Sequence, residues 1–84
     1  MTDREINEIE TRCNNATLGP WISYVEGRDH TSGCNFIMTG GDDIELTGAS
    51  IADQDFIAHA RQDIPNLVNE IYRLKELLKN FDHK

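Results

Sequence analysis

The last third of the sequence carries a long run of apolar residues at helical spacing, and this run limits what the chain can fold into. Between residues 56 and 81 apolar side chains recur at steps of mostly three or four, which places them on one face of an α-helix. They are Phe56, Ile57, Ala60, Ile64, Leu67, Val68, Ile71, Leu74, Leu78 and Phe81. The sequence therefore predicts a helical region over residues 50–80. Residues 1–84 are predicted to form a single domain, in which the rest of the chain packs against this helical region.

A proline interrupts this region. Ser50 and Asp53 have the spacing of a helix N-cap, so the helix is predicted to begin there. The ring of Pro65 is expected to clash with the carbonyl of Arg61, and proline cannot donate a backbone hydrogen bond. We therefore expect two helical segments broken near Pro65, with Asp63 as the N-cap of the second.

The N-terminal residues 1–17 predict another helix. Thr2 and Glu5 have capping-box spacing, and the sequence Leu18-Gly19-Pro20 ends the pattern. Its apolar face consists of Ile6, Ile9, Cys13 and Ala16. Cys13 is interpreted as a small buried apolar residue on this face rather than as a reactive thiol.

Residues 21–48 are rich in β-branched and aromatic residues separated by turn residues. The segments 21–26, 35–39 and 44–47 are each predicted to form a strand. Short connections between them favour a three-stranded antiparallel meander with one solvated face. The predicted fold class is therefore α+β, with an N-terminal helix, this meander and two C-terminal helical segments.

The apolar stripe at residues 64–81 is longer than such a sheet can cover. A helix over residues 64–80 is about 25 Å long, whereas five-residue strands are about 17 Å long. The excess apolar surface predicts a homodimer or higher homo-oligomer. The expected interface residues are Leu67, Ile71, Leu74 and Leu78.

Polar residues gather in the loop over residues 28–34, where a catalytic role and a solvated loop are the two interpretations. Ser32 or Cys34 with His30 and Asp29 contains the residue types of a triad, but no nucleophile-elbow pattern surrounds them. The solvated loop is favoured, so no enzyme activity is predicted. No metal site or cofactor is predicted either, because the histidines and cysteines show no C-x-x-C or H-x-x-x-H pair. The candidates considered are His30, His59, His83, Cys13 and Cys34.

A small anionic ligand is a further possibility. Arg28, His30 and Arg61 would bind the anion, and Trp21 would stack on a planar ring, although burial in the core is the favoured interpretation of the aromatic residues. The net charge of −7 and the lack of a basic patch argue against general nucleic-acid binding. No apolar run reaches the roughly 20 residues that span a bilayer. A cytosolic protein with reduced thiols is expected, and whether Cys13 and Cys34 lie close together stays open.

Two segments carry a resemblance. They are Ala16-Thr17-Leu18-Gly19-Pro20-Trp21 and residues 52–67, ADQDFIAHARQDIPNL. Together they resemble small phage and prophage proteins of the Ea22-like style, with Leu18 in place of a usual proline. The resemblance implies a phage origin and the cytoplasm of a bacterial host, and it supplies no activity. By analogy, it suggests a non-catalytic protein that sequesters a nucleotide-derived immune signal. The alternative is an interaction module that docks on a host protein through its C-terminal helix.

Overall fold

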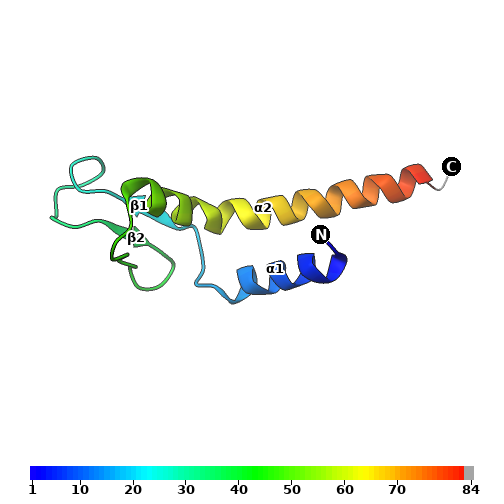
Figure 1. Ribbon diagram of the computed structural model, residues 1–84, viewed down its shortest axis with the longest axis horizontal. Coiled ribbons are helices and arrows are strands. Elements are labelled where there is room, and N and C mark those ends of the chain that lie inside the picture. The colour runs from blue at the N-terminus through cyan, green and yellow to red at the C-terminus, as the bar shows by residue number, and fades with distance from the viewer. Residues whose placement is uncertain (83–84) are drawn as a thin grey trace.

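The computed structural model describes residues 1–82 and has the shape of a rod. Its elements in chain order are α1 (Asp3–Asn15), β1 (Ile22–Tyr24), β2 (Phe36–Met38) and α2 (Ile51–Asp82), as Figure 1 shows. The extents are 60 × 22 × 21 Å and the radius of gyration is 16.9 Å, whereas a compact domain of this length has about 12 Å. The overall α+β class is confirmed.

Helix α1 begins at the predicted cap. The Glu5 amide donates to Thr2 Oγ1 at 3.1 Å, and the Thr2 amide donates to Glu5 Oε1 at 2.8 Å. This reciprocal pair satisfies two amides that the first turn leaves free. The helix ends two residues before the predicted boundary, with Ala16 as its C-cap.

The predicted three-stranded meander is wrong, because the sheet has two strands. β1 and β2 are antiparallel, and Ser23 lies opposite Ile37. The predicted third strand at residues 44–47 contributes one bridge, in which Ile37 and Ile44 exchange both backbone hydrogen bonds at 2.8 Å. The physical reason is the length of β2. In a three-residue strand only the central residue turns its backbone groups toward the outer edge, so the third segment has one residue to pair with.

The predicted break at Pro65 is also wrong. α2 is one helix of 32 residues with Pro65 inside it, and its capping box joins Ser50 and Asp53 as predicted. A proline inside a helix costs about 3 kcal/mol. Here both flanks of the proline are fixed by packing, since Ala58 is buried before it and Val68 is buried after it. Tertiary contacts on each side therefore outweigh the local penalty, and Asp63 is an exposed residue of a continuous helix.

α2 packs against two separate parts of the chain, the sheet and α1. The sheet packs on its first half, where Gln54 and Ala58 are buried. α1 runs antiparallel to its second half, because Asn7 Oδ1 accepts from the Tyr72 hydroxyl at 2.8 Å while Asp3 pairs with Lys75. Figure 1 shows α1 beside the middle of α2 and the last turns of α2 extending past it. The buried apolar residues are Ile6, Val25, Ile37, Ala58 and Val68.

Candidate functional site

One edge of α2 carries large apolar side chains, most of which are exposed within the described residues 1–82. We call this edge the α2 stripe; its residues follow one another in alternating steps of three and four, which keeps them aligned along a helix. It consists of Ile57, Ala60, Ile64, Leu67, Ile71, Leu74, Leu78 and Phe81. Ala60 and Ile71 are half-buried, and the other six residues are between 37% and 72% exposed. Of the four predicted interface residues, Leu67, Leu74 and Leu78 are therefore exposed on this edge.

The stripe is open because α1 and the sheet occupy another side of α2. The buried residues of α2 are Gln54, Ala58 and Val68, which lie at steps of four and ten and so share a face beside the stripe. Phe56, at 75% exposure, and Leu77 lie along the opposite margin of the stripe. Contiguous exposed apolar surface of this extent is typical of a protein interaction site rather than of scattered surface residues.

A recess of about 220 Å³ adjoins the first turns of the stripe. It lies where the end of α1 and the start of β1 approach α2. The lining residues are Arg12, Cys13, Ala16, Trp21, Ile57, Ala60, Arg61 and Ile64. The lining surface is almost entirely apolar, and the side chains of Arg12 and Arg61 form part of it. A planar apolar group would fit this lining.

Two of the four predicted ligand residues meet at this recess. Trp21 Nε1 and Arg61 Nε both donate to the carbonyl oxygen of Thr17 at 3.0 Å. The Gln62 side chain fixes the Trp21 backbone from α2, accepting from its amide at 2.7 Å and donating to its carbonyl at 3.1 Å. The Gly-Pro-Trp segment, with a cis bond between Gly19 and Pro20, is thereby held against α2.

Arg28 does not line the recess, because it is engaged elsewhere. Its guanidinium forms a bidentate pair with Asp55 at 2.8 and 3.0 Å and also contacts Asp29 at 2.9 Å. Hydrogen bonds from Arg28, with a smaller contribution from Ser23, lower the pKa of Asp55 to about 2. The same bonds raise the pKa of Arg28 above its ordinary range. This pair connects the loop after β1 to the first turns of α2.

His30 belongs to an aromatic cluster and not to a triad. Its ring lies edge-on to Phe36, with 5.2 Å between ring centroids, and to Tyr24 at 6.2 Å. Its Nδ1 contacts the Ser32 hydroxyl and lies 3.6 Å from a Glu26 carboxylate oxygen. A serine triad needs the hydroxyl and the carboxylate on opposite ring nitrogens, and here both lie at Nδ1.

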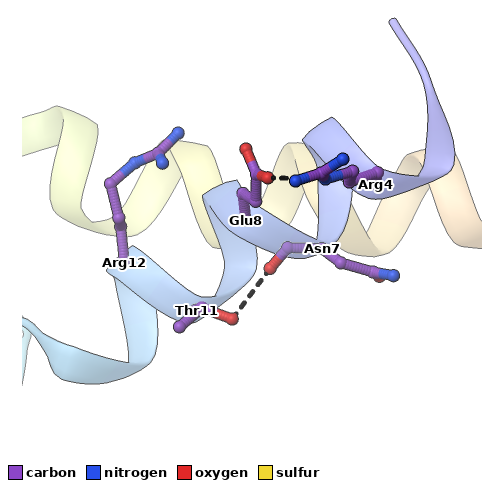
Figure 2. A pocket seen from close by; sticks show the side chains of 5 residues that line it. All are labelled: Arg4, Asn7, Glu8, Thr11 and Arg12. Atoms are coloured by element: carbon purple, nitrogen blue, oxygen red, sulfur yellow. Dashed lines mark hydrogen bonds and ion pairs between the residues drawn. The ribbon is translucent and has the colours of Figure 1, made fainter.

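Arg12 is a recess residue that the sequence analysis did not single out. Figure 2 shows it on the same side of α1 as Arg4 and Glu8, which pair with each other at 3.2 Å, while Arg12 takes no part in that pair. Within residues 1–82 no hydrogen bond or ion pair engages its guanidinium. The only sequence signal was its position next to Cys13, at the margin of the apolar face of α1.

The described part of the chain offers few other candidates for a metal site or a reactive thiol. Residues 1–82 contain no group of three His, Cys, Asp or Glu side chains placed to hold a metal ion. Cys13 is half-buried, Cys34 is exposed, and both are free thiols. His83 lies outside the described residues. No helix among residues 1–82 is long and apolar enough to cross a bilayer.

Comparison with known proteins adds no relative: no family model, no curated protein and no solved structure matches this chain.

Proposed function

We propose that this protein is a non-catalytic interaction module that binds its partner through the α2 stripe. The observation that carries the proposal is the exposure of six large apolar residues along one helix edge in a chain with a net charge of −7. Leaving such a surface in water is unfavourable, and covering it with another apolar surface is the main driving force for protein association. The rod shape supports this role, because the last turns of α2 extend past α1 and are accessible from several sides.

Replacing Leu74 and Leu78 with aspartate tests the proposal. Both side chains are exposed in the protomer, so the double variant is expected to keep its circular dichroism spectrum and its packing of α1. Two buried carboxylates in an apolar interface would be strongly unfavourable. We expect the association constant to fall at least a hundredfold. Sedimentation measures self-association, and affinity capture with a fixed amount of immobilised protein measures binding of other partners.

The matched control is Glu76→Lys with Lys79→Glu, which alters charges on the same turns off the stripe. This control should associate like the wild-type chain. Equal association of the wild-type and Leu74→Asp/Leu78→Asp proteins would contradict the proposal.

A second function, sequestration of a small nucleotide-like anion, is favoured by the recess. Trp21, Arg12 and Arg61 line one recess, and an aromatic ring close to two arginines is a combination that recognises a base with a phosphate. Arg28 and His30 would not take part directly, given their other contacts. The protein in this role would act without cleaving the ligand, in keeping with the resemblance to small phage proteins and a bacterial cytoplasmic setting.

Binding of a panel of cyclic dinucleotides, cyclic trinucleotides and cyclic ADP-ribose isomers tests the second function. A ligand that binds the native state raises the thermal midpoint, and the rise grows with the logarithm of the ligand concentration once that concentration exceeds Kd. We expect Arg12→Ala with Arg61→Ala to remove this shift, because both cations of the recess are then absent. Arg28→Ala should retain it. The absence of a shift for every compound at millimolar concentration would refute sequestration of these ligands.

A further inference from the structure

The residues of the α2 stripe follow a heptad pattern that specifies how two copies would pair. In the heptad notation a to g, position a is occupied by Ile57, Ile64, Ile71 and Leu78, and position d by Ala60, Leu67, Leu74 and Phe81. β-Branched residues at a with leucine at d favour two parallel strands in a coiled coil. Three of the four a positions are isoleucine, and two of the four d positions are leucine.

The charges on the two margins of the stripe distinguish parallel from antiparallel pairing. Among the charged residues between Ile57 and Phe81, Arg61 and Lys75 lie on the e margin, and Asp63 and Glu70 lie on the g margin. Parallel helices bring each g residue to the e residue five positions later on the other helix. Glu70, whose carboxylate pairs with Arg73 of its own helix in the protomer, then faces the partner's Lys75, twice by symmetry. Antiparallel helices instead bring e to e and g to g, which places like charges together.

The exposed area matches the requirement of a dimer. Six open residues of the stripe equal about three fully exposed side chains, or roughly 600 Å² at about 200 Å² each. Phe56 and Leu77 on the g margin bring the total to roughly 900 Å² per protomer. A typical stable interface buries about 800 Å² on each partner. The seam from Ile57 to Phe81 is about 36 Å long.

The recess supplies a second, independent observation. Its α2 wall includes Ile57 at position a and Arg61 at position e, and these are the positions that a g residue of a parallel partner contacts. That g residue is Phe56, whose side chain is 75% exposed in the protomer. An exposed phenylalanine and an open, largely apolar recess are complementary, because contact between them removes apolar surface of both from water.

We infer that α2 pairs with α2 of a second copy of this chain as a parallel, in-register, two-stranded coiled coil, with the partner's Phe56 seated at the recess. This inference rests on the proposed function, because it names the partner of the α2 stripe. It also leaves the recess without room for a nucleotide-like ligand in the dimer. α1 and the sheet then lie on the outer sides of the pair, where they already pack on α2.

Orientation is tested by disulfide formation in the full chain. Cys13→Ala and Cys34→Ser first remove the native thiols, and Leu74→Cys is then introduced at a d position. In a parallel in-register dimer the two Cys side chains face each other within the 4.4–6.8 Å Cα separation of a disulfide, so mild oxidation should give a covalent dimer. Asn66→Cys, at the outward-facing c position of the same helix, should give none. A dimer by sedimentation that yields no Leu74→Cys crosslink would overturn the parallel arrangement.

Charge reversal gives a test that leaves the apolar seam intact. Lys75→Glu should raise the dimer Kd about tenfold, because two attractive contacts become repulsive. Adding Glu70→Lys should restore most of the affinity. Asp3→Asn is the control for the ion pair that Lys75 makes with α1, and it should leave the Kd unchanged. In an antiparallel dimer Glu70 does not face Lys75, so Glu70→Lys alone would leave the Kd unchanged or lower it, and either result contradicts the inference.

The recess contact is tested by Phe56→Ala. Loss of the partner's ring from the recess should raise the dimer Kd at least tenfold, while Ile51→Ala, another exposed residue of α2 outside the heptads, should not. A mass of twice the 9.6 kDa chain is expected for the wild-type protein. A monomer at 200 µM, or a trimer or tetramer, overturns this inference. The proposed function would still stand in those cases if Leu74→Asp/Leu78→Asp abolished binding to a different partner.

Discussion

Replacing Gln54 with leucine is expected to lower the free energy of unfolding by about 3 kcal/mol. Gln54 is 4% exposed, and its Nε2 donates to Ser23 Oγ at 2.8 Å and to the Tyr24 and Phe36 carbonyls at 3.2 Å. One amide group thereby joins α2 to both strands. Leucine has a similar volume but cannot donate, so the buried Ser23 hydroxyl and a part-buried carbonyl on each strand lose a partner.

Gln62→Leu is the matched comparison for this change. Gln62 also bonds a backbone segment from α2, but it is only half-buried, and water can reach the Trp21 groups that it leaves. We expect a loss of about 1 kcal/mol. Urea denaturation followed by circular dichroism measures both values, at one fixed protein concentration because association adds to apparent stability. A Gln54→Leu protein as stable as Gln62→Leu would show that the buried amide is not a major link between helix and sheet.

The local features of the fold were predictable from the sequence, because they depend on neighbouring residues. The capping pairs of Thr2 with Glu5 and of Ser50 with Asp53 occur as predicted. Helix type and the position of the apolar stripe follow from spacing alone. The exposure of Leu74 was likewise expected, from comparing the length of the stripe with the length of a short sheet.

The errors arose where distant contacts overrule local preference. A proline predicts a helix end, yet Ala58 and Val68 are packed on either side of Pro65 by segments that are remote in sequence. Similarly, residues 44–47 have the composition of a strand, but β2 offers one residue at its open edge. Neither the burial of Val68 against α1 nor the length of β2 can be read from these segments themselves.

The candidate ligand site was half predictable for the same reason. Trp21 and Arg61 were both identified, and the structure places them at one recess. Arg28 was grouped with them as an available cation, but Asp55, 27 residues away, binds its guanidinium. A partner at that distance in the sequence leaves no local signal. Residue type alone therefore identified the cationic side chains, but it did not show which of them are already paired with a carboxylate of the same chain.

Replacing Gly40 with alanine is the second change expected to destabilise the fold strongly. A Cβ atom at Gly40 would lie 2.7 Å from the carbonyl oxygen of Leu18 and 2.9 Å from its Cβ. The Gly40 amide donates to that same carbonyl at 2.7 Å, which ties the loop after β2 to the segment before Trp21. The obstructing atoms are mainly backbone, so the two segments must separate and the hydrogen bond must lengthen. We expect a loss of about 2–3 kcal/mol.

Gly41→Ala is the control for this prediction, one residue along the same loop. Its added Cβ would meet Thr17 Cγ2 at 3.1 Å, the end of a side chain that can turn away. The loss in the free energy of unfolding should therefore stay below about 1 kcal/mol. Alanine also lowers the conformational entropy of the unfolded state, which offsets part of the loss. The same urea denaturation measures both variants, and tryptophan fluorescence reports the environment of Trp21. Because Leu18 lies three residues before Trp21, which lines the recess, Gly40→Ala should also shift the Trp21 emission. Equal stability of the two variants would show that the contact between Gly40 and Leu18 can relax without cost.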